Sequence, residues 1–324
     1  MSQLSPSTSE PSILSPVKFT QQPKSWLSAL WKFSRPHTVI GTSLSVFSLF
    51  LLTIAGQYNL SLEPGFGIAP SAFYGLLVTW MACLCGNVYI VGLNQLEDVE
   101  IDRINKPSLP LASGAFSRQQ AFSIVSMTGI LALLLAGSQS GYLLAMVGIS
   151  LLIGTAYSLP PVRLKRFPFW ASFCIFTVRG VVVNLGLFLH FNDGLPIPPK
   201  VWALTLFILV FTFAIAIFKD MPDAEGDRQY NISTLTIKLG QQTVFNLSRW
   251  TLTVCYGGMA IAGIAGLPGV NSLLLVGLHL GLLGIFWWRS FDVDLTDKTS
   301  ISSFYQFIWK LFFLEYLLFP LVCF

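Results

Sequence analysis

The sequence predicts an all-α integral membrane protein, and the composition and segment lengths carry that prediction. Hydrophobic residues make up 53% of the 324-residue chain, charged residues only 10%, and the mean hydropathy is +0.67. Apolar stretches approach the roughly 20 residues that a helix needs to cross a bilayer. The net charge of +4 gives no reason to expect a nucleic-acid partner.

The chain divides into a polar tail and one membrane domain. Residues 1–25 are rich in Ser, Pro and Gln, which is typical of a disordered tail. A plastid transit peptide has a similar composition, but this segment is short for one, so an untargeted tail is favoured. Residues 26–324 are expected to form a single transmembrane domain. Nine spans are expected in it, near residues 36–56, 70–95, 119–137, 141–159, 168–191, 201–219, 243–265, 271–288 and 304–324.

The placement of Lys and Arg predicts the orientation of these spans. If the N-terminus lies inside, the loops at 96–118, 160–167, 220–242 and 289–303 share its side. These loops and the N-terminal segment carry Lys18, Lys24, Lys32, Arg35, Arg103, Lys106, Arg118, Arg163, Lys165, Arg166, Arg228, Lys238, Arg289 and Lys298, whereas the opposite loops carry Lys200 alone. Cytoplasmic loops are enriched in Lys and Arg, so this side is predicted to be cytoplasmic.

Two short acidic clusters lie on the same predicted side. In the first, Asn94, Asp98 and Asp102 are spaced four residues apart. On one continuous helix this spacing places the three side chains on one stripe. Pro107 is expected to end that helix.

The second cluster contains Asp220, Asp223 and Asp227, whose spacings of three and four also predict one stripe. Carboxylates near hydrocarbon need a partner, and a hard divalent cation satisfies many oxygens at once. Mg²⁺ usually binds together with phosphate groups. The two stripes therefore predict a site for Mg²⁺ and a diphosphate, whereas Glu97, Glu100 and Glu225 are interpreted as solvated charges.

At these residues the chain resembles a known family. The segments NQLEDVEIDRINKPSLPLASG at 94–114 and KDMPDAEGDRQYNISTLTIKLG at 219–240 resemble the UbiA-type intramembrane prenyltransferases. More narrowly, they are similar to the homogentisate phytyltransferase branch of the cyanobacterial kind. Further matching stretches are FSRPHTVIGT at 33–42, YSLPPVRLKR at 157–166, TVRGVVVNLG at 177–186 and FYQFIWKLFFLEY at 304–316.

The resemblance implies nine helices around a central cavity, with an Asp-rich cap on the cytoplasmic side. It implies transfer of a C20 prenyl chain, phytyl, from phytyl diphosphate to homogentisate, with Mg²⁺ as cofactor. The implied product is 2-methyl-6-phytyl-benzoquinol, formed with loss of CO₂ and pyrophosphate on the path to tocopherol. The implied location is the thylakoid or plasma membrane of a cyanobacterium-like cell.

The resemblance also implies roles for individual residues. The metal ligands are expected to be Asn94, Asp98, Asp102, Asp220, Asp223 and Asp227, and the catalytic residues Asp98, Asp102, Asp223 and Asp227. Many family members carry Asp directly after the motif's Asn, whereas this chain has Gln95, whose role is left open.

Basic residues near the motifs are candidates for binding substrate. Arg103, Lys106, Arg163, Lys165, Arg166, Lys219 and Arg228 flank the acidic clusters, and each of them could instead be a positive-inside anchor. Arg179 differs because it lies within an apolar span, where an unpaired charge is costly. It is expected to face the cavity near Asn184 and Asn94, or alternatively to pair with a buried acid. His37, at the start of the first span, is a weaker candidate for a general base.

Two other interpretations stay open. Within the enzyme class, the acceptor could be a naphthoate or chlorophyllide, and the donor geranylgeranyl or solanesyl diphosphate. Outside it, intramembrane acids could form the cation path of a transporter. Such a path would place acids at mid-membrane depth in several helices, whereas these acids cluster on one face.

Overall fold

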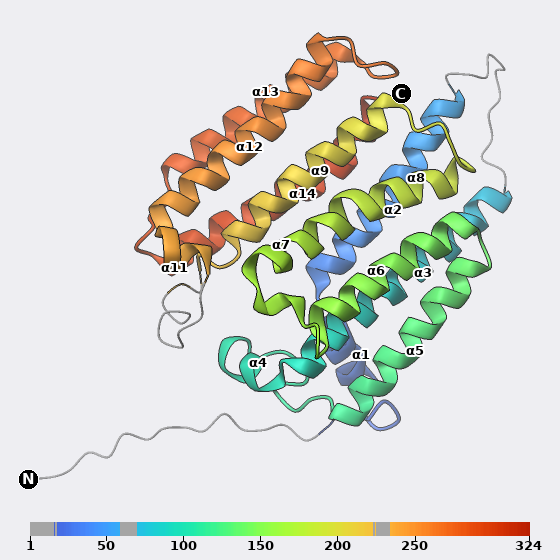
Figure 1. Ribbon diagram of the computed structural model, residues 1–324, viewed down its shortest axis with the longest axis vertical. Helices are drawn as coiled ribbons and strands as arrows, with labels where there is room; N and C mark the ends of the chain where they lie inside the picture. The colour runs from blue at the N-terminus through green and yellow to red at the C-terminus, as the bar shows by residue number, and fades with distance from the viewer. Residues whose placement is uncertain (1–15, 17, 59–69, 223, 225–233) are drawn as a thin grey trace, which may run out of the picture.

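The computed structural model describes residues 16, 18–58, 70–222, 224 and 234–324, and this part of the chain is helical throughout, without strands (Figure 1). The all-α prediction is therefore confirmed. The long helices are α2 (Pro36–Tyr58), α3 (Pro70–Glu97), α5 (Arg118–Gly137), α6 (Gly141–Ser158), α9 (Pro199–Phe218), α12 (Gln241–Ile264), α13 (Ser272–Phe291) and α14 (Lys298–Leu321). The shorter elements are α1 (Pro23–Phe33), α4 (Val99–Asn105), η1 (Leu164–Arg166), α7 (Pro168–Phe176), η2 (Thr177–Val182), α8 (Val183–Phe191) and α11 (Leu235–Leu239).

Seven helices in the described part are long and apolar enough to cross a membrane: α2, α3, α5, α6, α9, α13 and the continuous segment Phe169–Phe191. The last segment joins α7, the π-helical turn η2 and α8. The two remaining predicted spans coincide with α12 and α14, which have 24 residues each but are not among these seven helices. The multi-pass architecture agrees with the sequence, and the count of nine spans stays a prediction.

A buried polar pair lies between α14 and its neighbour. The carboxylate of Glu315 lies 3.3 Å from Nε2 of His279 in α13, and both side chains are almost completely buried. A paired acid is far less costly in an apolar bundle than an isolated one. Because Glu315 is paired with His279, α14 can place this acidic side chain in the interior of the bundle.

The long helices pack side by side, with α9 in the interior (Figure 1). In its most apolar 18-residue window α9 is 67% buried, whereas α13 is only 17% buried. α9 contacts α12, α14 and η2, while α13 packs mainly on α12. α13 therefore presents most of its apolar surface outward, as expected of a helix that faces lipid.

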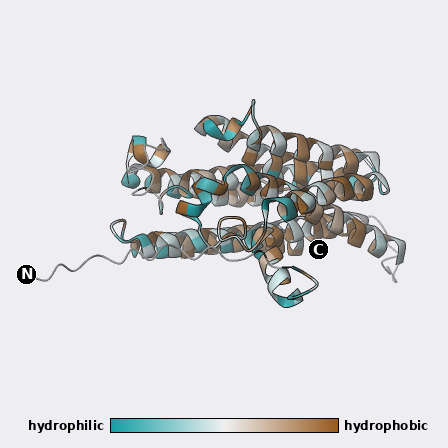
Figure 2. Cartoon of the chain, turned by 90° about the horizontal axis from the view of Figure 1, so that it is seen from below, coloured by the Kyte–Doolittle hydropathy of each residue, from teal (hydrophilic) through white to brown (hydrophobic). Residues whose placement is uncertain are grey.

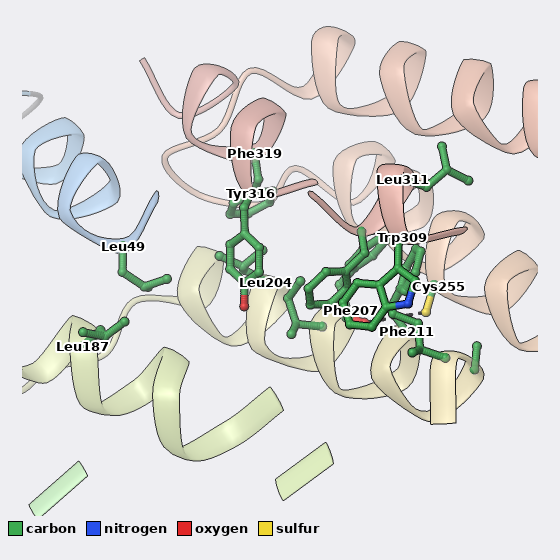
Figure 3. Packing of buried hydrophobic residues seen from close by; sticks show 14 of the residues in the cluster. Leu49, Leu187, Leu204, Phe207, Phe211, Cys255, Trp309, Leu311, Tyr316 and Phe319 are labelled. Atoms are coloured by element: carbon green, nitrogen blue, oxygen red, sulfur yellow. Dashed lines mark hydrogen bonds between the residues drawn. The ribbon is translucent and has the colours of Figure 1, made fainter. Parts of the chain in front are cut away.

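One large hydrophobic core runs through the bundle. It joins residues of α2, α8, α9 and α14, including Leu49, Leu187, Phe211 and Trp309 (Figure 3). A second, smaller core joins α1 to α3 and α5 through Phe33, Phe116 and Val125. The second core holds α1 against the end of the bundle where α3 ends.

The short elements α1 and α4 and the α6–α7 connection lie near the same end of the long helices (Figure 1). Apolar residues dominate the long helices, whereas hydrophilic residues gather in the short connecting segments (Figure 2). This end carries the first acidic cluster and its basic neighbours, as the charge pattern predicts.

Gly180 permits the closest approach between η2 and α9, which makes it a test of the fold. A Cβ added at this position would lie 2.7 Å from Cα of Leu209, a backbone atom that cannot turn aside. We expect Gly180→Ala to destabilise the protein by about 1–3 kcal/mol, the usual range for overpacking. Thermal unfolding in detergent micelles measures the effect.

The matched control is Gly257→Ala in α12, where an added Cβ meets nothing within 4 Å. Ala favours a helix interior over Gly, so this variant should be as stable as the wild type or slightly more so. Equal unfolding midpoints for the two variants would show that the η2–α9 contact is not tight.

Candidate functional site

The first acidic cluster lies where α3 meets α4. The prediction of one continuous helix through Asp102 is wrong, because α3 ends at Glu97 and α4 begins at Val99. Asp98 lies between them with φ −111° and ψ 19°. Backbone hydrogen bonds still link Asp98 N to Asn94 O (3.1 Å) and Asp102 N to Asp98 O (2.7 Å), so the interruption is a kink. α4 ends before Pro107, as expected.

The side chain of Asp98 is the centre of an ionic network. Its Oδ1 lies 3.0 Å from Nη2 of Arg163, and its Oδ2 lies 2.6 Å from Nζ of Lys165. Nδ2 of Asn94 also donates to Oδ2, at 3.2 Å. All these side chains are partly buried. Asp98 is therefore neutralised by two cations from the connection between α6 and α7, far away in the sequence.

The network includes a residue that the sequence did not single out. Nη2 of Arg35 donates to Oδ1 of Asn94 at 3.2 Å. Arg35 lies between α1 and α2 in the left-handed backbone region, with φ 53°. In the sequence it is one of many basic residues on the predicted cytoplasmic side. Its position directly before Pro36 was the available signal, because a residue before proline rarely continues a helix.

Asp102 is the most deeply buried acid of this cluster, with 6% of its surface exposed. Among the described residues its Oδ2 has no hydrogen-bond partner. Burial raises the pKa of Asp102, nearby Asp98 also raises it, and the charges of Arg35, Lys106 and Lys165 oppose the increase. A buried carboxylate oxygen without a partner next to further oxygens fits a hard cation such as Mg²⁺.

Burial also affects Lys165. Desolvation lowers the pKa of its ammonium group, and the hydrogen bond and charge of Asp98 oppose that decrease. The carboxylate of Asp98 thus stabilises the charged form of Lys165 in its partly buried position. A negatively charged ligand could serve the same purpose.

The second acidic cluster is only partly within the described residues. Lys219 and Asp220 follow the end of α9 directly and are half-buried. Asp223, Asp227 and Arg228 lie outside the described residues. The described part of the chain contains no group of three or more His, Cys, Asp and Glu side chains that could hold a metal. The two-motif metal site therefore stays a prediction.

Some predicted site residues lie outside the network. Arg103 is exposed and donates to both carboxylate oxygens of Glu100, at 2.9 and 2.8 Å. Lys106 and Arg166 are exposed as well. The Glu100 side chain is 80% exposed, in agreement with its interpretation as a solvated charge.

The position of Gln95 answers the question that the sequence left open. Its side chain is completely buried, and Nε2 donates to the backbone carbonyl of Phe33 at 2.7 Å. Asn87 donates similarly to the carbonyl of Ser34, at 3.1 Å. Nε2 of Gln95 thus fastens the end of α1 to α3, next to the strained Arg35, while its buried Oε1 has no hydrogen-bond partner among the described residues.

Arg179 occupies the π-helical turn η2 in the middle of the span Phe169–Phe191. Its guanidinium carbon lies 5.1 Å from the ring centre of Trp309 and 5.5 Å from that of Phe312. Within the described part of the chain no carboxylate pairs with it, so the alternative of a buried acid partner finds no support there. The two expected neighbours form other bonds, Asn184 with Gly180 and Asn94 with Asp98.

His37 lies in the first turn of α2, beside Trp309 of α14. Its ring centre is 5.2 Å from that of Trp309, and the charges of Arg179, Arg35 and Lys106 all act on it. The electrostatic environment at the start of α2 is therefore positive. Such a concentration of positive charge attracts anionic ligands.

Comparisons with known proteins identify the family. Residues 40–311 match the UbiA prenyltransferase family. The chain is 58% identical over 299 residues to the homogentisate phytyltransferase of Synechocystis sp., covering 91% of this chain and 95% of that protein. It is 37% identical to the homogentisate geranylgeranyltransferase of Hordeum vulgare, covering 91% of this chain and 72% of that protein.

A solved structure shares the fold. A UbiA homolog from Archaeoglobus fulgidus, bound to GPP and Mg²⁺, superposes with a TM-score of 0.58 at 17% identity. The match covers 91% of this chain and all of that one. The family match spans most of the chain, and the relatives match over nearly its whole length. The chain therefore belongs to the UbiA prenyltransferase family.

Proposed function

We propose that this protein transfers the phytyl group of phytyl diphosphate to homogentisate. The observation that carries the proposal is the 58% identity to the Synechocystis enzyme over 95% of that enzyme's length. In the reaction the C–O bond of the donor breaks and releases pyrophosphate, and a C–C bond forms to the aromatic ring. The ring loses a proton, and the acetate side chain loses CO₂ and gains a proton to become the methyl group of 2-methyl-6-phytyl-benzoquinol.

The Asn94–Asp98–Asp102 cluster would hold the diphosphate end of the donor through Mg²⁺. The oxygen-only donor set and the unpartnered Oδ2 of Asp102 support this assignment, and the related archaeal fold has been solved with Mg²⁺ and GPP. Asp220, Asp223 and Asp227 are proposed to complete the ligand set. When bound, Mg²⁺ would neutralise the leaving diphosphate.

Arg163 and Lys165 are proposed to bind diphosphate oxygens, with Lys219 and Arg228 contributing from the second motif. In the structure both Arg163 and Lys165 pair with Asp98, so both cations lie at the cluster that would hold the diphosphate. Charge-assisted hydrogen bonds from such groups favour a developing pyrophosphate over the intact ester. Exposed Arg103, Lys106 and Arg166 are weaker candidates, since solvent screens their charges.

The allylic end of the donor needs a dry pocket with aromatic faces. Trp309 and Phe312 of α14 supply such faces beside Arg179. Arg179 is proposed to bind an anionic substrate group, either the carboxylate of homogentisate or a diphosphate oxygen. Its position away from any carboxylate of the described residues leaves its donors available for that group.

The donor chain and the membrane belong to the same proposal. Phytyl diphosphate is proposed as the preferred donor because the Synechocystis relative is a homogentisate phytyltransferase. Geranylgeranyl diphosphate is the second candidate because the Hordeum vulgare relative is a homogentisate geranylgeranyltransferase. The proposed location is the thylakoid or plasma membrane of a cyanobacterium-like cell. Membership of a prenyltransferase family favours the enzyme over the transporter interpretation.

Membranes containing the protein, supplied with Mg²⁺, should convert homogentisate and phytyl diphosphate to the prenylated quinol and pyrophosphate. Chromatography of the extracted quinols measures the product, with dihydroxynaphthoate and chlorophyllide as rival acceptors and geranylgeranyl and solanesyl diphosphates as rival donors. Chelation of Mg²⁺ should abolish turnover. Product with a rival acceptor alone would overturn the assignment of homogentisate.

Removing a metal ligand should be far more harmful than removing a solvated acid of the same cluster. We expect Asp98→Ala and Asp102→Ala each to lower kcat by about 100-fold or more, where every tenfold loss is about 1.4 kcal/mol. The same loss is predicted for Asp223→Ala and Asp227→Ala. Initial rates of pyrophosphate release measure it.

Glu100→Ala is the matched control, because Glu100 belongs to the same short helix as Asp102 but is exposed. This variant and Glu225→Ala should retain nearly full activity. Comparable losses in the Glu and Asp variants would refute the division of the acids into ligands and solvated charges.

Arg179→Gln should raise the KM for one substrate by at least tenfold and leave the other KM nearly unchanged. The reason is that a charged hydrogen-bond donor which contacts only one substrate affects the binding of that substrate. Steady-state kinetics with each substrate varied in turn make the measurement. Two unchanged KM values together with a lower unfolding midpoint would make Arg179 a structural residue.

A further inference from the structure

The π-helical turn that carries Arg179 is held in place by a chain of buried hydrogen bonds. Oη of Tyr316 in α14 donates to Oδ1 of Asn184 at 2.9 Å, and Nδ2 of Asn184 donates to the carbonyl of Gly180 at 2.8 Å. An amide oxygen has no proton, so the tyrosine must be the donor and the direction of the chain is unambiguous. Asn184 and Tyr316 are 0% and 2% exposed.

The same face of α14 also contacts the Arg179 side chain. The rings of Trp309 and Phe312 lie against the guanidinium. Along α14, Phe312 follows Trp309 by three residues, and Tyr316 follows Phe312 by four. Residues at this spacing share one helix face. In Figure 3, Trp309 and Tyr316 project from α14 towards the same side. One face of α14 therefore contacts the side chain that η2 carries, and it reaches the backbone of η2 only through the side chain of Asn184 in α8.

The opposite side of the turn is also constrained. At Gly180 the backbone of η2 approaches the backbone of α9 so closely that a Cβ would lie 2.7 Å from Cα of Leu209. The turn is thus confined between α9 and α14. A π-helical turn is rare, is often found at functional sites and needs such support from its surroundings.

We propose that Tyr316 and Asn184 are positioning residues that hold η2 in its π-helical form and so direct the guanidinium of Arg179 towards substrate. The inference rests on the proposed function, because it assigns to these two residues the orientation of a substrate-binding group. Two apolar side chains would fill the same space and would leave only the carbonyl of Gly180 without its side-chain donor. The presence of a polar pair at these positions is explained by its hydrogen bond to the carbonyl of Gly180 in η2.

Kinetics of the full-length protein in detergent test the proposal. Tyr316→Phe removes one hydroxyl group and should raise the KM of the substrate that Arg179→Gln affects by roughly three- to tenfold, the range of one hydrogen bond. The KM of the other substrate should stay unchanged. In an Arg179→Gln background Tyr316→Phe should add nothing, because both changes then act through one group.

The double variant Asn184→Leu with Tyr316→Phe separates positioning from stability. Tyr316→Phe alone leaves Oδ1 of Asn184 unpaired and should lower the unfolding midpoint, whereas the double variant leaves neither side chain with an unpaired polar group and should recover most of that loss. Its KM should nevertheless stay raised. A purely structural pair would instead restore the KM together with the midpoint.

Tyr89→Phe is the matched control. The hydroxyl of Tyr89 in α3 hydrogen-bonds to Oγ1 of Thr155 in α6 at 2.8 Å and does not contact η2. This variant also removes a tyrosine hydroxyl bond between two helices, so it should leave both KM values unchanged. Equal KM changes in Tyr89→Phe and Tyr316→Phe would overturn the proposal.

A structure of the double variant provides a readout that does not depend on activity. We expect η2 to relax to regular α-helix or the guanidinium to leave the rings of Trp309 and Phe312. An unchanged turn with Arg179 still on both rings would refute the positioning role. If the wild type forms no product from homogentisate, the proposed function fails, and this structure still decides the role of Tyr316 and Asn184.

Discussion

The carboxylate of Asp98 joins parts of the chain that are far apart in sequence. It lies at the kink between α3 and α4 and accepts bonds from Asn94, Arg163 and Lys165. Asn94 in turn accepts from Arg35, which precedes α2. An ionised carboxylate at the end of an apolar bundle is costly unless it is paired. Pairing Asp98 therefore brings the start of α2, the end of α3 and the α6–α7 connection together.

The same network leaves one acid without a partner. Asp102, one turn beyond Asp98, is buried more deeply, and none of the described residues bonds to its Oδ2. The fold thus satisfies Asp98 and leaves Oδ2 of Asp102 without a partner among the described residues, which is the feature on which the proposed cation site rests. When a diphosphate approaches, Arg163 and Lys165 would have a second anion to bind, which would free the oxygens of Asp98.

Sequence patterns were sufficient for what depends on composition and local spacing. Hydropathy located the long helices, and the prolines located the end of α4, because transfer free energy and a missing N–H act locally. Acids at intervals of four located the first motif. Sequence patterns did not predict the kink between α3 and α4. The side-chain pairs of Asp98 with Arg163 and Lys165 at this kink are tertiary contacts that no local pattern records.

The role of Gln95 was also beyond local reasoning. In the sequence it stands inside the acidic motif, but its side chain is turned towards the end of α1 and donates to Phe33 O. A helix places adjacent residues on different faces, so a neighbour of a ligand often serves the packing of another element. Arg35 shows the converse, since a residue outside the motif enters the network only through the fold.

Three of the basic residues around the site, Arg35, Arg163 and Arg179, lie on irregular pieces of backbone. Arg35 and Arg163 adopt left-handed conformations with φ of 53° and 37°, and Arg179 lies in a π-helical turn. Regular helices in a bundle direct long charged side chains outward, because burying an unpaired cation is costly. At Arg35 and Arg163 the left-handed backbone costs of order 1–3 kcal/mol each.

Those departures persist because other contacts hold them. Gln95 and Asn87 fasten the carbonyls next to Arg35, Asp98 pairs with Arg163, and Asn184 with Tyr316 holds the turn of Arg179. Buried polar side chains that look like isolated anomalies in an apolar sequence thus have a common purpose. They hold the irregular backbone segments that carry the cations proposed to bind an anionic substrate.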